Sequence, residues 1–244
     1  MDQQNYQEEL TIWAPVLDVA PRDYLNAYRE MLGLRKSTNL ICSRQYRGNL
    51  KIEANNCADI PEEENCRLWI TGLPPTCTHS QLLSSIRGIG PVYASHITEP
   101  QQDGPRTWET SAASLTFFTA DATNKFLAQH AAVEPFTVGG FKTKVIRHRI
   151  KTRGAAVNGR SRVLRIVGDS WLVEPERLHR VITVEWGVRY DTDFMQFTPG
   201  GAVSEVVWAF GSFRAQAHII FGNINRFFSG RARAMYIADP CMRD

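Results

Sequence analysis

Several features that mark other protein classes are scarce or absent in this 244-residue sequence. The five cysteines form no C-x-x-C pair, so the sequence favours neither a disulfide framework nor a zinc site. No apolar run reaches the roughly 20 residues of a membrane-spanning helix, and the N-terminal MDQQNYQEEL is unlike a signal or transit peptide. These absences predict an intracellular protein, in the nucleus or the cytoplasm, that holds no metal and contacts no membrane.

The motifs of common enzymes are also missing. The run Gly139-Gly140-Phe141-Lys142-Thr143 lacks the G-x-x-x-x-G-K-[ST] spacing of a phosphate-binding loop. Neither a G-x-S-x-G elbow nor an H-E-x-x-H helix occurs, and the six histidines are scattered. We therefore expect a non-catalytic protein without a cofactor.

Acidic residues are absent from one long stretch, residues 135–168, which we call the basic segment. Its nine cations are Lys142, Lys144, Arg147, Arg149, Lys151, Arg153, Arg160, Arg162 and Arg165. The formal net charge of the whole chain is only +3, so the positive charge is concentrated in this segment. A local positive field of this kind is typical of a surface that binds a polyanion. The alternative is a solvated linker with scattered surface charge.

Residues 1–65 read as an N-terminal extension that is partly helical and partly disordered. Residues 21–32 are expected to form a helix, with Leu25, Tyr28 and Leu32 on one face. That face could pack on a domain of this chain or bind a partner protein. Residues 35–65 are polar and irregular, end in Glu62-Glu63-Glu64, and predict a linker.

Residues 66–151 alternate between strand and helix patterns. Strands are expected at 67–73, 91–98, 111–118 and 141–150, and helices at 82–89 and 122–129. Thr78 and Gln81 stand at the spacing of a capping box before the first helix. The order is β-α-β-β-α-β, the split βαβ arrangement.

The same order recurs in residues 162–244, with strands at 162–168, 188–197, 203–210 and 231–237 and helices at 174–185 and 213–223. The spacing from Leu68 to Phe117 is 49 positions, and that from Leu164 to Phe210 is 46. Such agreement indicates an internal repeat. The predicted fold class is α+β: two ferredoxin-like domains in tandem, 66–151 and 162–244, joined by a basic linker, 152–161.

The LWITGL run at residues 68–73 resembles the strand-one motif of the RNA recognition motif (RRM) family. The resemblance occurs twice, over about two-thirds of the chain, and the overall texture is similar to RRM-like proteins of filamentous fungi. It implies binding of single-stranded RNA, with an aromatic ring at the second motif position, here Trp69, stacking on a base. A Trp covered by the linker or the N-terminal helix is the alternative.

The strand-three motif of that family departs from its pattern here. Its two exposed aromatic positions fall on Ala112 and Ser114 in the first domain and on Glu205 and Val207 in the second. Arg165 replaces the strand-one aromatic in the second domain, which leaves Trp69 as the stacking candidate. If Val145 is a core residue, Lys144, Ile146 and His148 share the open sheet face with Trp69.

The leading hypothesis is a protein that binds single-stranded RNA through the basic segment and Trp69. The candidate RNA-binding residues are Arg67, Trp69, Thr71, Ser114, Lys144, Arg147, His148, Arg149, Lys151, Arg153, Arg160, Arg162 and Arg165.

A competing hypothesis is a protein-interaction module that binds no RNA. Arg226-Phe227-Phe228 resembles the R-x-F element of the UHM class, RRM-derived domains that bind a tryptophan-bearing peptide. Arg226 and Phe228 would then bind the peptide, with Glu174, Glu176 and Glu185 attracting its basic residues. Alternatively, Phe227 or Phe228 belongs to the core, and the second domain serves as a scaffold for the first.

Overall fold

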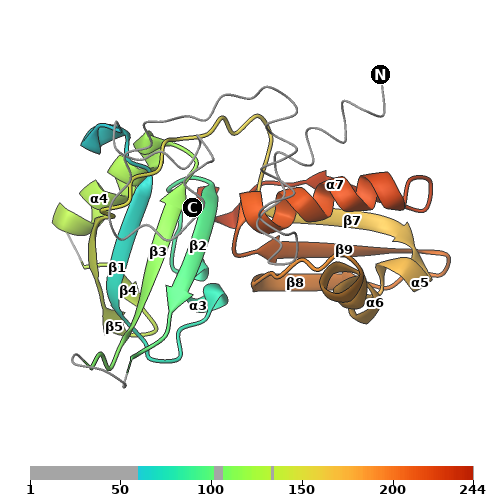
Figure 1. The fold of residues 1–244 in the computed structure, drawn as a ribbon, viewed down its shortest axis with the longest axis horizontal. Helices are drawn as coiled ribbons and strands as arrows, with labels where there is room; N and C mark the ends of the chain where they lie inside the picture. Colours follow the sequence, from blue (N-terminus) through green and yellow to red (C-terminus); the bar gives the residue numbers. More distant parts are fainter. Residues whose placement is uncertain (1–59, 102–106, 133–134, 244) are drawn as a thin grey trace, which may run out of the picture. The chain divides into compact units, whose positions relative to one another are not determined.

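The computed structural model describes residues 60–101, 107–132 and 135–243. The predicted helix at 21–32 and most of the predicted linker at 35–65 lie outside these residues. Within them the chain forms two four-stranded antiparallel sheets, each with helices on one face (Figure 1). This is the α+β architecture with two RRM-like domains that the repeat predicts.

The first sheet has the strand order β2-β3-β1-β6. Its elements are β1 (Arg67–Leu73), α3 (His79–Ser84), β2 (Val92–Thr98), β3 (Ser111–Phe117), α4 (Ala120–Ala132) and β6 (Lys144–Arg147). Burial alternates along β1: Leu68 and Ile70 are fully buried, whereas Trp69 and Thr71 are partly exposed on the opposite face. The predicted bounds of this strand are confirmed.

The capping box before α3 is also confirmed. The backbone N–H of Gln81 donates to the Thr78 hydroxyl at 3.2 Å, and the Gln81 side chain accepts from the Thr78 N–H at 3.0 Å. These bonds satisfy backbone donors that the first turn of a helix leaves without intrahelical partners. The helix ends at Ser84, earlier than predicted, although Ile86 and Ile89 after it are still buried.

The fourth strand of the first domain differs from the prediction of 141–150. Residues Thr137–Val138 (β4) and Phe141–Lys142 (β5) form a separate hairpin, and only Lys144–Arg147 (β6) pairs with β1. Thr143 separates the two pieces: its backbone N–H and its hydroxyl both donate to the Phe136 carbonyl, at 2.9 and 2.8 Å. These bonds tie Thr143 to Phe136 and interrupt the strand.

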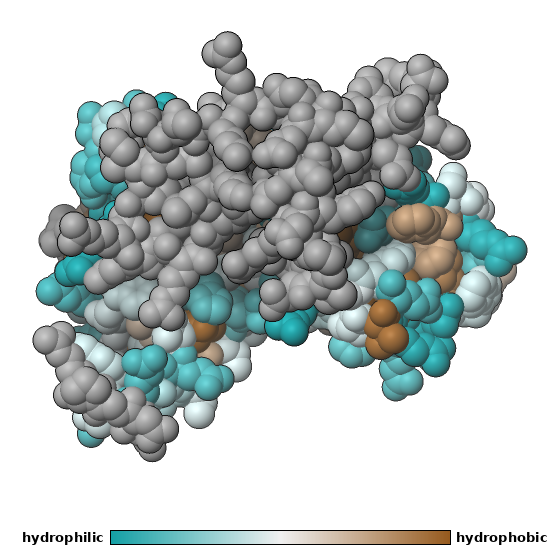
Figure 2. All heavy atoms as spheres, viewed as in Figure 1, coloured by the Kyte–Doolittle hydropathy of each residue, from teal (hydrophilic) through white to brown (hydrophobic). Residues whose placement is uncertain are grey.

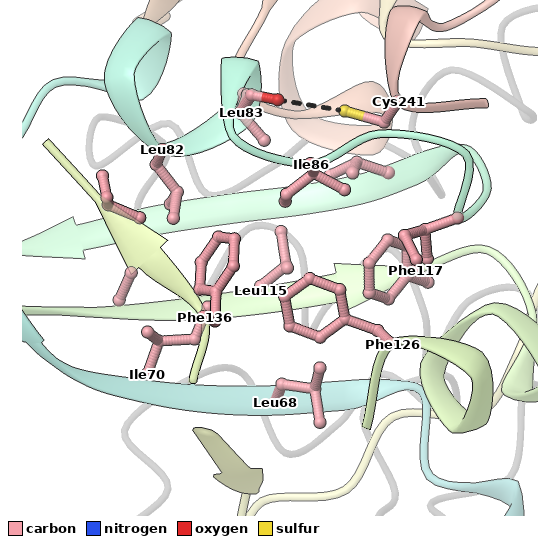
Figure 3. Close-up of a cluster of buried hydrophobic side chains, with 14 of the residues drawn as sticks. Leu68, Ile70, Leu82, Leu83, Ile86, Leu115, Phe117, Phe126, Phe136 and Cys241 are labelled. Atoms are coloured by element: carbon pink, nitrogen blue, oxygen red, sulfur yellow. Dashed lines mark hydrogen bonds between the residues drawn. The ribbon is translucent and has the colours of Figure 1, made fainter. Parts of the chain in front are cut away.

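The core of the first domain lies between its sheet and helices (Figure 3). The core includes Leu68, Ile70, Leu82, Leu83, Ile86, Leu115, Phe117 and Phe126. Cys241 belongs to the same core although it follows the second sheet, and its thiol donates to the Leu83 carbonyl at 3.5 Å. The free cysteines Cys66 and Cys241 are both buried, and burial raises the pKa of each thiol, that of Cys66 to about 11.

The second sheet has the strand order β10-β7-β9-β8, which matches the first once the strands are numbered within each domain. Its strands are β7 (Val163–Asp169), β8 (Thr192–Thr198), β9 (Val203–Phe210) and β10 (Ala232–Tyr236). Arg165 lies opposite Val207 and Met235, just as Trp69 lies opposite Ser114 and Ile146. Arg165 therefore occupies the strand position of Trp69, as the repeat predicts.

The helices of the second domain are more divided than predicted. The segment after β7 comprises α5 (Ser170–Val173), α6 (Pro175–Arg180) and the π-helical η3 (Val181–Glu185). The segment after β9 begins with the π-helical η4 (Phe213–Ala217) and continues as α7 (His218–Phe227), which runs along the sheet in Figure 1. Trp208 is buried in this domain, as predicted, and its indole N–H donates to the Thr192 hydroxyl at 3.0 Å.

The two domains contact one another along β2. The backbone N–H and the hydroxyl of Ser95 both donate to the Gly211 carbonyl, each at 2.9 Å. The Asp239 carboxylate accepts from the Val92 N–H at 2.9 Å, and the Cys241 carbonyl accepts from the N–H of Ile89 at 3.0 Å. The region around η5 (Pro240–Met242) therefore joins the second domain to the first.

Candidate nucleic-acid interface

The open face of the first sheet has an aromatic and apolar centre. The rings of Trp69 and His148 are in edge-to-face contact, with centroids 5.5 Å apart, and Ile146 lies directly opposite Trp69 with 45% of its surface exposed. Lys144 is exposed and lies opposite Thr71. The predicted shared face of Trp69, Lys144, Ile146 and His148 is confirmed, with Val145 packed against the core.

Polar groups border this centre on the β3 side. Ser114 lies opposite Trp69, and its hydroxyl accepts a hydrogen bond from Arg67 Nη2 at 3.3 Å. Ala112 lies opposite Thr71 in the same strand pair. Trp69 therefore has only small side chains across from it in β3, and these leave the indole without an aromatic neighbour in that strand.

His148 is uncharged at neutral pH. Burial lowers its pKa from 6.5 to about 4, and the nearby positive charge of Arg67 acts in the same direction. The backbone N–H of Ile150 donates to His148 Nδ1 at 2.9 Å, which requires that this nitrogen carry no proton. The ring beside Trp69 therefore contributes shape and a polar edge at neutral pH, not positive charge.

Replacing His148 with glutamine is expected to reduce the acid sensitivity of the fold. Between pH 6.5 and about 4 the unfolded chain binds a proton at His148 that the folded chain does not. The stabilising contribution of the neutral ring is therefore complete above pH 6.5 and is lost as the pH falls toward 4. Urea midpoints at about pH 7 and about pH 5 should differ less in His148→Gln than in the wild type. The exposed His96→Gln is the control, and equal acid sensitivity in all three proteins would contradict this expectation.

Three cations of the basic segment are paired with the residues just before β1. Lys151 Nζ lies 3.0 Å from the Glu62 carboxylate, and Arg153 Nη1 lies 3.2 Å from that of Glu64. Arg147 Nε lies 4.0 Å from Glu62, and its guanidinium also donates to the carbonyl of Asn65 at 2.8 Å and to the side chain of Asn124. The acidic groups that oppose the basic segment therefore come from outside it. Residues 60–65 are part of the fold and not the irregular linker expected there.

Arg162 was predicted to contact RNA, and this prediction is wrong. Its side chain is fully buried, with Nε and Nη2 donating to the two oxygens of Asp239 at 3.0 and 2.9 Å. Nη1 donates to Asp193 at 2.8 Å and to the Phe210 carbonyl at 3.0 Å. Burial acts to lower the pKa of Arg162, but the charge of Asp239 outweighs it and the pKa is raised. Arg162 is thus a buried structural cation, since no ligand can reach it.

Arg165 is exposed on the second sheet, where its Nη2 lies 2.6 Å from the Glu205 carboxylate. The hydrogen bond from Arg165 lowers the pKa of Glu205 and raises that of Arg165 itself. The open face of the second sheet therefore carries an ion pair at the position where the first carries Trp69.

Three other predicted cations, Lys144, Arg149 and Arg160, are exposed. They form no ion pair with any described residue. Arg160 lies close enough to His218 and Tyr236 for its charge to act against the protonation of His218, whose pKa is lowered mainly by burial and also by Arg160. The His218 ring nitrogen Nδ1 is 2.8 Å from the Tyr236 hydroxyl, and Phe221 stacks on Tyr236 at 4.3 Å. Sequence reasoning missed this aromatic group because its members are far from Arg160 along the chain.

The predicted peptide-binding residues lie on the helical side of the second domain. Phe228 packs against the second core and lies 5.6 Å from the Trp186 ring of the same chain. Phe227 is 56% exposed, and the Arg226 guanidinium lies 5.2 Å from its ring centroid. Glu174 and Glu176 are exposed at the start of α6. In Figure 2 the hydrophobic side chains among the described residues form small separate groups between hydrophilic ones.

No helix in the described ranges is long and apolar enough to cross a membrane. Over the same ranges, no group of three or more His, Cys, Asp or Glu side chains is placed to hold a metal ion.

Comparison with protein-family models and with curated protein sequences gave no match. Among solved structures, the chain is similar to RNA recognition domains 1 and 2 of Sex-lethal from Drosophila melanogaster, at 14% identity over 71% of this chain and 100% of that one, with a TM-score of 0.25. The first two RRM domains of the yeast poly(U)-binding protein Pub1 are similar at 14% identity over 70% of this chain and 99% of that one, with a TM-score of 0.28. Protein BT0572 from Bacteroides thetaiotaomicron is similar at 11% identity over 73% of this chain and 96% of that one, with a TM-score of 0.24. The RRM-like character of both domains rests on their strand order and register.

Proposed function

We propose that the protein binds single-stranded RNA, without catalysis, on the open face of the first sheet. The observation that carries the proposal is the group formed by Trp69, Ile146 and His148, with Lys144 at its edge. Aromatic rings stack on unpaired bases of any sequence, and neighbouring cations attract the phosphates between them. We also propose domain boundaries at 66–151 and 162–244, with 152–161 as the connection, and a location in the nucleus or the cytoplasm.

Each side chain on this face has a distinct role in the proposal. Trp69 stacks on one base, and His148 and Ile146 pack against the edge of that base or its sugar. Thr71 provides a hydroxyl group for base or ribose contacts, as single-stranded RNA recognition uses. Ser114, predicted to contact RNA, is buried and its hydroxyl accepts from Arg67, so it orients that arginine and does not itself meet the strand. Arg67, Lys144, Arg149 and Arg160 bind phosphates, while Arg165 is engaged by Glu205 and contributes less.

Replacing Lys144 and Arg149 with alanine is expected to reduce the salt dependence of RNA binding. Each phosphate contact with a single strand contributes about 0.7 to the slope of log K against log salt, so the loss of two contacts should reduce the slope by about 1.4. Fluorescence anisotropy with a labelled oligouridine over a series of salt concentrations measures this. The control, Arg180→Ala with Arg189→Ala, removes two exposed cations from the second domain. An unchanged slope in the Lys144/Arg149 variant would refute phosphate binding at this edge.

The peptide-binding hypothesis has weaker support. A peptide tryptophan would have to approach Phe228, but the Trp186 ring of this chain already lies beside it. Phe228 is accordingly a packing residue of the second domain. The exposed Phe227 and Arg226 remain the only part of the R-x-F element that a partner could contact.

A further inference from the structure

The three acidic residues before β1, Glu62, Glu63 and Glu64, form a short 3-10 turn, which we call the acidic turn. Both of its ends are fixed. Ile60 before it is 5% exposed, and Asn65 after it is fully buried. The Asn65 side chain donates to the His148 carbonyl at 3.1 Å and accepts from the N–H groups of Arg67 and Thr152, at 3.1 and 3.2 Å. The acidic turn is therefore tied to β1 and to the chain that leaves β6.

Two of the three carboxylates of the acidic turn form ion pairs with cations of the basic segment. Glu62 pairs with Lys151 and Arg147, and Glu64 pairs with Arg153. Glu63 is exposed and makes no ion pair with any residue in the described ranges. Within the basic segment, the acidic turn therefore forms ion pairs with these three cations and with no others.

The carboxylates of these ion pairs are open to solvent, whereas the Lys151 side chain is 26% exposed and also donates to the Ile60 carbonyl at 2.8 Å. About half of the Glu62 and Glu64 side chains is exposed, and 63% of the Arg153 side chain is exposed. A carboxylate and a phosphate offer the same kind of oxygen acceptors to guanidinium and ammonium groups, so one can replace the other. Exposed pairs are weak and screened by salt, and a polyanion can therefore compete for the cations.

Two of the paired cations, Lys151 and Arg153, follow His148 along the chain, just beyond the strand that carries Ile146 opposite Trp69. Arg147 lies opposite the buried Leu68, and its guanidinium donates to Asn124 of α4, so it faces the helix-covered side of the sheet. A strand of RNA that stacks on Trp69 and follows the chain past His148 would reach Lys151 and Arg153.

We propose that the acidic turn occupies a phosphate track formed by Lys151 and Arg153, and that RNA must displace Glu62 and Glu64 to use it. This inference rests on the proposed function, because it concerns the same RNA surface. The acidic turn then acts as a built-in competitor that lowers the affinity for any strand long enough to reach the track. An RNA strand that covers only the open sheet face around Trp69 does not reach the acidic turn. The loss of affinity should therefore depend on the length of the RNA.

The test is the variant Glu62→Gln with Glu64→Gln, which keeps side-chain size and removes both charges. The probes are two oligouridines, one of about 4 and one of about 12 nucleotides, which bracket the site size of typical single-strand-binding folds. Anisotropy titrations at several salt concentrations give the affinity and its salt slope. The matched control is Glu174→Gln with Glu176→Gln, which makes the same change in charge on the exposed start of α6. Urea midpoints check that all the variants fold.

We expect the Glu62/Glu64 variant to bind the longer oligouridine about tenfold more tightly than the wild type, since two exposed pairs no longer compete. Its salt slope should be steeper by about 0.7 for each phosphate that gains a contact. The shorter oligouridine and the control variant should show little change.

The inference is overturned if the Glu62/Glu64 variant and the wild type bind the longer oligouridine with equal affinity. It is also overturned if the control variant gains as much affinity as the Glu62/Glu64 variant. In both cases the proposed function stands as long as Trp69→Ala still weakens RNA binding. Absence of RNA binding by every protein at low salt overturns the proposed function itself, and the inference with it.

Discussion

Replacing Arg162 with methionine is expected to lower the free energy of unfolding by about 3–5 kcal/mol, because it leaves buried carboxylates without their cation. Asp239 is fully buried, and both of its oxygens accept from Arg162. Burial raises the pKa of Asp193 despite the opposing effect of Arg162, so removal of the cation favours protonation of this carboxyl further. The loss should appear as a lower urea midpoint at neutral pH.

Arg165→Met is the matched control for this experiment. Arg165 also pairs with a carboxylate, that of Glu205, but on an exposed sheet face where water solvates both charges. Its urea midpoint should stay close to that of the wild type. Similar losses in Arg162→Met and Arg165→Met would show that burial does not decide the importance of these pairs. Asp239→Asn, which removes the charge from the other partner, should destabilise the protein as Arg162→Met does.

Trp69→Ala is expected to have the largest effect on RNA binding. Stacking of a base on an aromatic ring contributes about 1–3 kcal/mol, so the dissociation constant should rise roughly 5- to 150-fold. No aromatic residue of β3 can take over this role, because Ala112 and Ser114 stand at the positions that usually carry one. Trp69→Phe should retain most of the affinity, since it keeps an aromatic face. Anisotropy titration with an oligouridine at constant salt measures both variants.

The control for Trp69 is Trp171→Ala. Trp171 is 55% exposed on α5 of the second domain, where the Arg231 guanidinium lies 5.8 Å from its ring, and it is not on the proposed RNA face. Its removal should leave RNA affinity unchanged. If Trp69→Ala binds RNA as the wild type does, the first sheet is not the RNA-binding surface, and the acidic turn has no RNA to compete with.

The parts of the fold that could be predicted from sequence are those set by local patterns. The bounds of β1 follow from the alternation of Leu68 and Ile70 with Trp69 and Thr71, and the start of α3 follows from the Thr78 capping box. The repeat of β-α-β-β-α-β in both halves follows from similar spacing of buried residues. The grouping of Ile146 and His148 with Trp69 could be predicted because side chains alternate between the two faces of a strand. Once Val145 is assigned to the core, its neighbour Ile146 must lie on the open face.

The features that sequence reasoning missed depend on partners far along the chain. Arg162 stands within a run of cations, and nothing near it in sequence indicates that Asp239, 77 positions away, buries and neutralises it. The position of the acidic turn was also not predictable from nearby residues, because Asn65 donates a hydrogen bond to the His148 carbonyl, 83 positions away. A count of charges in a window shows where cations are concentrated, but tertiary contacts decide which of them meet solvent.

The insertion of Cys241 into the first core has a consequence for the order in which the protein is made. The first sheet is synthesised before the second, yet the backbone N–H groups of Ile89 and Gly90 donate to the Cys241 carbonyl, and that of Val92 donates to Asp239. When β6 has just left the ribosome, the core of the first domain therefore still lacks Cys241. That domain reaches its final packing only after residues 239–241 have emerged, so its maturation waits for translation of the second sheet.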